Sequence, residues 1–249
     1  GAICTDVAFV TANMHAMRLK EQILRVNEHL TGNRLLRGMA CLGGVRFDWD
    51  ADQIKGLNGL VNDLRPEFDS LVQLVEGSSS TLDRLDTTGI LKPEVARDLG
   101  VVGIAGRASG FAHDLRRDLP HAAYDQVRIR VPVHQVGDVR HRLQVRVDEV
   151  RESLALIQTF IAKLPGGPLR IEIGEVPPDR VAFGYVEGWR GEIFHWIRTA
   201  PNNRLARCRV KDPSLQNWPA LSEAVLDNIV PDFPVINKSF NLSYSGTDR

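Results

Sequence analysis

Cysteine is scarce in this sequence. Its 249 residues include only Cys4, Cys41 and Cys208, and no two of these have the spacing of a metal-binding pair. An odd number of scattered thiols also argues against the disulfide framework of an extracellular protein. We therefore expect unpaired thiols, buried as small apolar groups, in a reducing cytosol.

An excess of charge of one sign and long apolar runs are also lacking. Lys plus Arg and Asp plus Glu number 31 each, so the formal net charge is zero. This balance gives no electrostatic footprint for nucleic acid or for an anionic membrane surface. No apolar run approaches the roughly 20 residues of a membrane span. The first ten residues contain an acidic residue and no basic start, so they do not resemble a secretory leader.

Motifs for nucleotide binding and for serine hydrolysis are absent. The sequence contains no Gly-x-x-x-x-Gly-Lys-Ser/Thr, no Gly-x-Gly-x-x-Gly and no Gly-x-Ser-x-Gly. We therefore do not expect this chain itself to bind NADH. The seven histidines are dispersed, and His15 and His29 do not lie one helical turn apart, so no zinc site is predicted. His195, between two aromatic residues, is interpreted as a half-exposed strand residue.

Glycine is concentrated near the middle of the chain. Gly100, Gly103, Gly106 and Gly110 stand within eleven positions, too many for a helix or strand interior, where each costs roughly 0.5–1 kcal/mol relative to alanine. Apolar residues lie between them, so we interpret the segment as a close-packed irregular crossing. Six polar residues follow: Arg107, Ser109, His113, Asp114, Arg116 and Arg117. They fit a buried turn that satisfies its own backbone, or a redox or anion site.

Apolar periodicity predicts a set of helices. The expected helices span residues 6–31, the region from Asp50 or Asp52 to Val75 with a kink or break at Pro66, a short segment with Ser80 and Asp83 as a capping box, residues 93–99, residues 138–164, and residues 219–228 with Asn217 as a possible cap. The pattern in 138–164 is the clearest, because apolar residues recur in alternating steps of four and three. Such a seam is typical of a helical bundle.

Alternating apolar and polar residues predict strands at 126–133 and 169–173, and an antiparallel hairpin formed by 181–198 and 204–210. The tail beyond residue 228 is expected to be irregular. The predicted fold class is α+β, mainly α: a helical bundle with a small antiparallel sheet. No repeat or linker divides the chain, so we predict a single domain over residues 1–249. Residues 1–165 are its mainly helical part, and 166–249 hold the hairpin, a helix and the tail.

A charged sequence lies inside the predicted hairpin. Glu187, Arg190 and Glu192 flank Trp189 and alternate with glycines. Such a group can form a buried ion-pair knot or line an interface. We favour the structural role.

The glycine-rich segment resembles a known family. Gly103-Ile-Ala-Gly-Arg-Ala-Ser-Gly-Phe-Ala-His-Asp-Leu-Arg-Arg117, followed by Tyr124-Asp125, is similar to a signature of the 49 kDa subunit of respiratory complex I. That family is shared with the large subunit of membrane-bound nickel–iron hydrogenases, including a hydrogenase-4-like branch. Further similar motifs stand in the same order along the chain: Thr31-Gly-Asn-Arg34, Leu42-Gly-Gly-Val45, Val131-Pro-Val133, Leu164-Pro-Gly-Gly167, Tyr185-Val-Glu-Gly-Trp-Arg-Gly-Glu192 and Asn228-Ile-Val-Pro-Asp-Phe-Pro234.

The sequence departs from that family where the hydrogenases bind metal. The C-terminal Cys-x-x-Cys pair would fall at Ser243 and Gly246, which supply no thiolate, whereas nickel and iron require soft ligands. By the resemblance, the N-terminal pair and the quinone-contacting His and Tyr belong to a region upstream of this sequence, so we expect residues to be missing there. Cys41 stands where the family usually has arginine. No metal site is expected in this chain.

The resemblance implies a fold like that of the nickel–iron hydrogenase large subunit and a function in a complex I-like, membrane-associated oxidoreductase. The chain would pack against an iron–sulfur small subunit and support electron transfer from it to quinone. The iron–sulfur clusters, flavin and NADH would lie on partner subunits, and the chain alone is expected to be inactive. It would lie in the cytoplasm, peripheral to the inner face of the cytoplasmic membrane through its partners.

The resemblance also points to a candidate site. Its members are predicted to form a wall that faces a quinone or a cluster: Arg107, Ser109, His113, Asp114 and Arg116. Two alternatives stay open. One is a metal-free scaffold or assembly paralogue of a hydrogenase large subunit, and the other is an active hydrogenase with unusual ligands.

Overall fold

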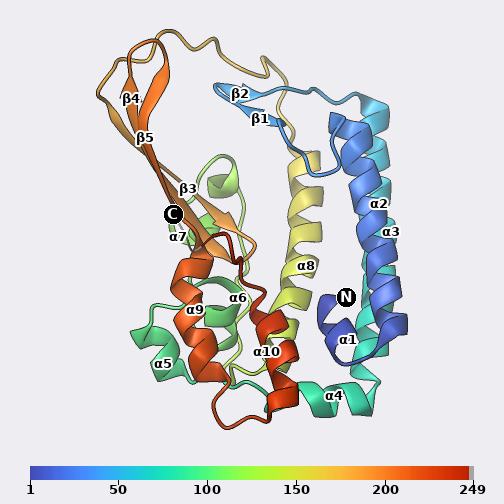
Figure 1. Ribbon diagram of the computed structural model, residues 1–249. Coiled ribbons are helices and arrows are strands. Elements are labelled where there is room, and N and C mark those ends of the chain that lie inside the picture. The colour runs from blue at the N-terminus through green and yellow to red at the C-terminus, as the bar shows by residue number, and fades with distance from the viewer. Residues whose placement is uncertain (247–249) are drawn as a thin grey trace.

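The computed structural model describes residues 1–246 and shows an α+β protein built mainly of helices, as the sequence predicts (Figure 1). The α-helices of the described chain are α1 (Ala2–Asp6), α2 (Val10–Thr31), α3 (Ala51–Glu76), α4 (Ser79–Leu85), α5 (Pro93–Asp98), α6 (Gly103–Ala108), α7 (Leu115–Asp118), α8 (Val139–Ala162), α9 (Pro213–Ala224) and α10 (Phe233–Phe240). The strands are β1 (Ala40–Cys41), β2 (Gly44–Val45), β3 (Val181–Gly188), β4 (Gly191–Ala200) and β5 (Arg204–Lys211). Two 3₁₀ turns, η1 (Tyr124–Gln126) and η2 (Val230–Asp232), complete the set.

Three long helices form the bundle. α2 packs against α3, and α3 packs against α8. Buried side chains such as Leu19, Val61 and Leu154 join the three helices in one apolar cluster. α8 confirms the predicted helix, but the predicted seam is only partly buried: Leu154 lies in this cluster, whereas Val150 and Ile157 are exposed. α3 begins at a capping box in which Asp50 and Gln53 exchange hydrogen bonds. Within residues 1–246, no helix combines the length and hydropathy needed to cross a bilayer.

A second core forms where the C-terminal end of the chain returns to the helices. α10 packs against α1, α8 and α9, and α9 packs against α5. Their apolar faces share a cluster that includes Leu91, Val101, Val139, Leu221 and Ile236. This core therefore joins elements from before and after residue 165.

Arg142 on α8 is fully buried in this second core. Its Nε donates to the Ser239 hydroxyl at 2.8 Å, Nη2 donates to the Gly89 carbonyl at 2.9 Å, and Nη1 donates to the Gly137 carbonyl. The guanidinium carbon also lies 4.4 Å from the centroid of the Phe240 ring. Burial lowers the pKa of Arg142 to about 9. One guanidinium thus connects three segments that are distant in sequence.

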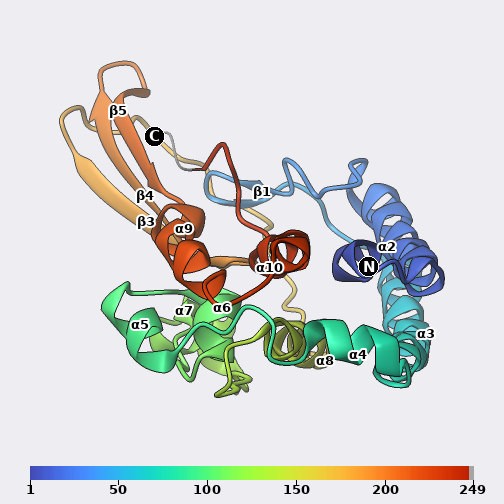
Figure 2. The same ribbon diagram turned by 60° about the horizontal axis from the view of Figure 1, so that its bottom comes forward.

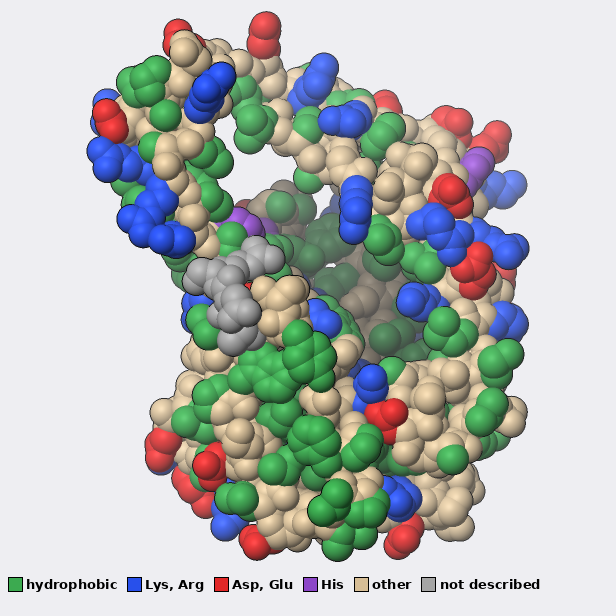
Figure 3. Space-filling model, viewed as in Figure 1, with side chains coloured by type: hydrophobic (Ala, Val, Ile, Leu, Met, Phe, Trp, Pro, Cys, Tyr) green, Lys and Arg blue, Asp and Glu red, His purple; other side chains and the backbone are tan. Residues whose placement is uncertain are grey.

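The three-stranded sheet projects from the helical body as an arm (Figures 1 and 2). Its strand order is β3-β4-β5, and both pairs are antiparallel. A register irregularity lies between Arg198 and Thr199. The space-filling view shows an open hollow between the arm and the helical body (Figure 3). The base of the sheet touches helices, where β4 packs against α6 and α9 and β3 packs against α7.

The helix predicted at residues 6–31 begins later, at Val10, and the residues before it form a separate short helix, α1. The chain breaks after α1 and turns at Ala8, whose φ of 59° lies in the left-handed region. The apolar residues continue at helical spacing through this turn, and so the break leaves no gap in the pattern. The turn allows α1 to pack beside both α2 and α10.

Two details of the following helices also differ from prediction. Pro66 lies inside α3 without ending it, because the helix continues to Glu76. The N-cap of α4 is Ser78, whose hydroxyl accepts a hydrogen bond from the Thr81 N–H; the predicted cap at Ser80 is wrong.

The strands predicted at 126–133 and 169–173 do not form. In the first segment Ile129 is buried and the Arg130 N–H donates to the Glu152 carboxylate on α8. The alternation therefore marks an extended segment that packs on a helix rather than in a sheet. The second segment makes only an isolated antiparallel bridge between Gly44 and Arg170.

The C-terminal helices also correct the prediction. α9 begins six residues earlier than expected, at Pro213, with Asp212 as its cap. Asn217 is a buried residue inside α9, and its amide both accepts from the Val102 N–H and donates to the Val102 carbonyl. The tail predicted to be irregular contains α10.

The glycine-rich segment is a close-packed crossing, as predicted, but its centre is the helix α6 rather than irregular chain. Gly103 begins this helix with a φ of +65°. A Cβ atom there would lie 2.0 Å from the Arg190 carbonyl oxygen and 2.6 Å from the Gly191 nitrogen. The missing side chain lets the start of α6 touch the β3–β4 turn backbone to backbone.

This contact gives a matched pair of glycine substitutions. Gly103→Ala should lower the free energy of unfolding by about 3 kcal/mol or more, because it combines a left-handed φ with a backbone clash. Gly56→Ala in α3 should raise it by about 0.5–1 kcal/mol, because nothing lies within 4 Å of its Cβ position. Urea unfolding of both variants measures the difference. Equal effects would contradict the backbone contact.

Candidate functional site

A buried guanidinium lies at the centre of the candidate site. Arg107, on α6, is 1% exposed. Its Nη2 lies 2.7 Å from Glu149 Oε1 on α8, and its Nη1 lies 3.1 Å from Glu187 Oε1 on β3 and 3.5 Å from Asp114 Oδ2. Nη1 also donates to the His113 carbonyl at 3.0 Å. One cation thus holds carboxylates from three separate parts of the chain.

Asp114 connects this cation to a second one. It is fully buried and caps α7 by accepting from the Arg116 N–H. The Arg116 guanidinium donates to both Asp114 oxygens, with Nε–Oδ1 and Nη2–Oδ2 distances of 2.9 and 2.6 Å. The Leu115 N–H donates to Glu187 Oε2 at 3.0 Å, so Glu187 holds the start of α7 as well as Arg107. We call the five charged residues Arg107, Asp114, Arg116, Glu149 and Glu187 the buried ion network.

The network contains three carboxylates and two guanidiniums. The pKa values of the three carboxyl groups shift in different directions. Burial raises the pKa of Glu149 and of Glu187 above the ordinary range, and the nearby guanidiniums offset this only in part. Burial acts in the same direction on Asp114, but the hydrogen bonds and charge of Arg116 outweigh it and lower that pKa. The environment therefore favours the neutral form of the two glutamates and the ionised form of Asp114.

A more exposed group borders the network. His113 is placed between two carboxylates, with its Nε2 2.8 Å from Glu192 Oε2 and its Nδ1 3.2 Å from Asp118 Oδ2. The other Glu192 oxygen lies 2.8 Å from Lys211 Nζ on β5. Burial alone would raise the pKa of Glu192, but the hydrogen bonds from Lys211 and His113 lower it. This chain of contacts connects the loop before α7 to the base of the arm.

The five residues predicted to form a wall divide into two sets. Arg107, Ser109 and Asp114 are buried within this chain, where Ser109 Oγ donates to the Leu91 carbonyl at 2.9 Å. The side chains of His113 and Arg116 are 44% and 15% exposed. A partner could therefore touch His113 and Arg116, with the buried three supporting them from behind. The role of these residues as a wall stays a prediction.

Glu149 and Glu187 belong to the network but were absent from the predicted site. Glu187 fits the interpretation of a buried ion-pair knot, whereas Arg190 lies outside the network. Arg142, Arg146 and Glu149 are spaced by four and three residues along α8, which is the spacing of a helix face. That charged stripe was the signal available in the sequence, since it runs beside the apolar seam.

Arg190 and Arg146 instead both lie over the ring of the half-exposed Trp189. Their guanidinium carbons are 5.0 and 5.3 Å from the centroid of its ring. Arg190 Nε donates to the Asn241 carbonyl, and Arg146 Nη2 donates to the Ser239 carbonyl. Burial lowers the pKa of Arg146 to about 10. These contacts tie the β3–β4 turn to the end of α10.

The positions of the expected metal-binding pair follow α10. The Gly246 N–H donates to the Ser243 hydroxyl at 3.1 Å, and Trp218 Nε1 donates to the Ser243 carbonyl at 3.3 Å. A Cβ atom on Gly246 would lie 2.6 Å from the Asp212 carboxyl carbon. A hydroxyl and a hydrogen do not replace two thiolates, so these residues do not fit a nickel–iron centre. Over residues 1–246, His, Cys, Asp and Glu side chains nowhere gather in a group of three or more that could hold a metal ion.

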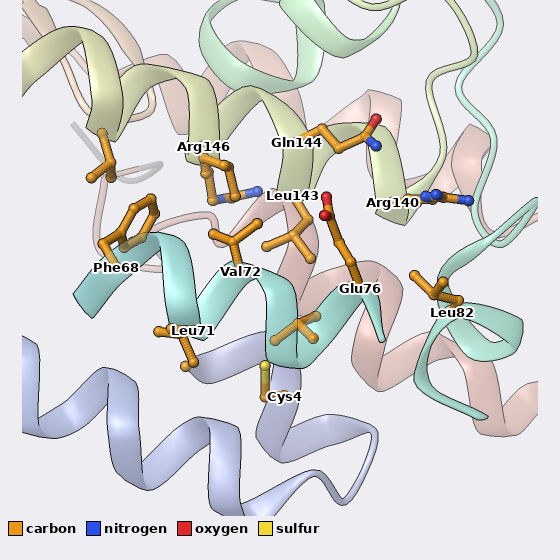
Figure 4. Close-up of a pocket in the computed structure, with 14 residues that line it drawn as sticks. Cys4, Phe68, Leu71, Val72, Glu76, Leu82, Arg140, Leu143, Gln144 and Arg146 are labelled. Atoms are coloured by element: carbon orange, nitrogen blue, oxygen red, sulfur yellow. The ribbon is translucent and has the colours of Figure 1, made fainter. Parts of the chain in front are cut away.

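A separate apolar cavity lies between α1, α3 and α8 (Figure 4). It has a volume of about 160 Å³, and Phe68, Val72 and Leu143 are among its walls. Polar side chains, including Glu76 and Arg140, line its edge. The cavity contains none of the five residues of the ion network. The charged site and this cavity are therefore distinct features of the fold.

Comparison with known proteins agrees with the resemblance in the sequence. The family model described as respiratory-chain NADH dehydrogenase, 49 Kd subunit, matches residues 6–180 and 171–249. Formate hydrogenlyase subunit 5 of Escherichia coli (strain K12) is 36% identical over the whole chain, which covers 44% of that protein. An NADH-quinone oxidoreductase subunit of Roseiflexus sp. (strain RS-1) is 31% identical over 260 residues, covering all of this chain and 70% of the relative.

A solved structure shares the fold. A chain of the membrane-bound sulfane sulfur reductase, described as an archaeal respiratory membrane complex, superposes with a TM-score of 0.92 and 25% identity. The match covers 99% of this chain and 69% of that one. The chain therefore spans less than half of formate hydrogenlyase subunit 5 and about two thirds of these two other matches.

The ion network predicts a large effect of removing its central cation. Arg107→Met should lower the free energy of unfolding by about 3–5 kcal/mol, because it leaves buried carboxylates without a partner. Arg97→Met, at an exposed pair with Asp98, should change it by less than about 1 kcal/mol. Adding Glu187→Gln to Arg107→Met should recover part of the loss. Additive losses in the double variant would contradict the coupling.

The opposite pKa shifts of two glutamates predict opposite pH dependences. The pKa of Glu149 is raised in the folded protein. The contribution of this carboxyl group to stability is therefore fully present below the ordinary pKa of glutamate, and it is lost as the pH rises through the raised value. The stability of Glu149→Gln relative to that of the wild type should therefore rise from pH 5 to pH 8. The lowered pKa of Glu192 gives a contribution that is present above the ordinary pKa and lost as pH falls, so Glu192→Gln should show no such gain. Urea unfolding at both pH values tests this difference, and an equal gain in both variants would contradict the assignment.

Proposed function

The chain belongs to the family of the 49 kDa subunit of respiratory-chain NADH dehydrogenase, and we propose that it serves as the corresponding subunit of a complex I-like, membrane-associated oxidoreductase. In this proposal, electrons pass from an iron–sulfur small subunit to quinone beside this chain. Flavin and NADH bind other subunits. The chain lies at the cytoplasmic face of the membrane and associates with it through its partners.

The observation that carries the proposal is the pair of positions Ser243 and Gly246. The family match extends through this segment, yet neither residue can bind a soft metal. A family member without these thiolates fits the quinone-reducing branch of the family better than it fits the hydrogenases. The buried ion network supports the same function, since it gives the face formed by His113 and Arg116 a rigid base with fixed charges.

A metal-free scaffold or assembly paralogue is the second candidate. The same missing thiolates favour it, because a scaffold needs the fold and its contacts but no redox ligand. This function requires the chain for the stability of a complex and not for electron transfer through it.

Purification of the native complex through a tag on the full-length protein separates these functions. We expect an iron–sulfur small subunit among the recovered proteins, identified by mass spectrometry, and quinone reduction by the purified complex. His113→Gln should lower the rate of quinone reduction about tenfold or more if this side chain faces the reacting partner. His29→Gln, an exposed residue on α2, is the matched control and should leave the rate unchanged.

Each result has a defined meaning. A complex that keeps its subunits and its rate with His113→Gln contradicts the wall of the candidate site but not the proposed function. Recovery with assembly factors alone, without an iron–sulfur subunit, supports the scaffold. Nickel in the purified material would contradict both.

A further inference from the structure

The arm carries a concentration of positive charge that the buried site does not use. From Phe194 to Lys211 the sequence has five basic residues and no acidic one, in a chain whose overall formal charge is zero. Figure 3 shows Lys and Arg side chains gathered along the outer side of the arm. The charge is therefore local to this element.

The sheet register places these basic residues on one face. Trp196 pairs with Arg209 and Arg198 pairs with Arg207, while Phe183 on β3 pairs with Trp196. Directly paired residues share a face of the sheet, and alternate residues return to it. We call the resulting surface the basic face, formed by Phe183, Phe194, Trp196, Arg198, Arg204, Arg207, Arg209 and Lys211.

Three of these arginines have no carboxylate partner within residues 1–246. Arg204, Arg207 and Arg209 are exposed and make no ion pair there, whereas Arg198 pairs with Asp179 at 2.9 Å and Lys211 pairs with Glu192 at 2.8 Å. Arg198 and Arg207 also lie directly opposite one another, an arrangement of like charges that destabilises a sheet. A carboxylate next to Arg207 would offset this repulsion.

Apolar surface accompanies the charge. Phe183 is 60% exposed and stacks on Phe194 with a centroid distance of 5.2 Å. A shallow groove runs over these two rings, Trp196 and Arg209. The face therefore offers both anion-binding groups and apolar contact area.

β5 is also an edge strand with open backbone hydrogen-bonding groups. In the described sheet its neighbour is β4 on one side, and the other side carries no further strand. An exposed edge of this kind can accept an additional strand from another polypeptide. The added strand would place alternate side chains next to the basic face, at the same two-residue period as Arg207 and Arg209.

We propose that β5 and the basic face bind an extended, acidic segment of a partner polypeptide, which adds to the sheet as a fourth strand. Carboxylates at alternate positions of that segment pair with Arg207 and Arg209. The open strand edge favours a polypeptide over nucleic acid or lipid, since only a polypeptide can continue the backbone ladder. The proposal is independent of electron transfer, because none of these arginines belongs to the buried ion network.

Binding of designed peptides to the full chain tests the proposal. The probe is a fluorescein-labelled eight-residue peptide of alternating Glu and Val, measured by fluorescence anisotropy at low salt. We expect saturable binding that weakens as salt is added. A peptide of alternating Glu and Pro has the same charge but cannot pair as a strand, and it should bind about tenfold more weakly or worse.

Charge reversal supplies the matched variants. Arg207→Glu with Arg209→Glu should abolish binding of the Glu-Val peptide and create binding of a Lys-Val peptide. Lys20→Glu with Arg37→Glu makes the same change in net charge at exposed positions away from the arm and should preserve Glu-Val binding. Circular dichroism confirms that both double variants fold.

Three results would overturn the proposal. Equal binding of the Glu-Val peptide to both double variants would show that net charge alone is responsible. Equal binding of the Glu-Pro and Glu-Val peptides would exclude strand addition. Binding to phosphatidylglycerol vesicles or to single-stranded DNA through the same arginines, without peptide binding, would assign the face to another class of partner.

Discussion

The fold around the candidate site depends on one buried cation. Burying Arg107 away from water is unfavourable unless its charge is compensated, and the compensation comes from α8, β3 and the loop before α7 at once. Arg116 and Arg146 also act on these carboxylates. The network therefore specifies how these elements meet, while burial keeps the pKa values of Glu149 and Glu187 raised.

The buried network and the arm are connected through a short chain of polar contacts. His113, Glu192 and Lys211 join the loop before α7 to β4 and then to β5. Glu192 lies at the start of β4, immediately after the turn that touches Gly103. The backbone contact at Gly103 and the polar contacts of His113, Glu192 and Lys211 therefore both lie at the base of the sheet. The sheet is held firmly at its base, while most of its length stands clear of the helices.

The sequence predicted those elements whose signal is local. The helix α8 and the antiparallel sheet depend on periodicity, and both are present, although residues 181–198 form two strands rather than one. The predictions that failed concern residues whose neighbours in the fold lie far away in the sequence. Residues 126–133 alternate like a strand, but their apolar side packs on α8. Asparagine often caps helices, yet Asn217 lies inside α9. Its side-chain amide instead bonds both the N–H and the carbonyl of Val102.

The candidate site was predictable to a similar extent. The family motif identified the α6 to α7 segment, but Glu149 and Glu187 enter the site only through tertiary packing. Likewise, Ala8 adopts a left-handed φ that no apolar pattern could indicate. In each case the missing information was which distant backbone or charge lies next to the residue.

The burial of Arg142 has a consequence for the order in which the protein can acquire its structure during synthesis. Two of its acceptors, the carbonyls of Gly89 and Gly137, emerge from the ribosome before or close to Arg142 itself, whereas the Ser239 hydroxyl and the Phe240 ring emerge almost a hundred residues later. Until α10 arrives, the helix carrying Arg142 has a guanidinium facing an unfilled gap, which water must solvate. The helical core can thus form early in a hydrated state, and it becomes dry only when the end of the chain closes over it.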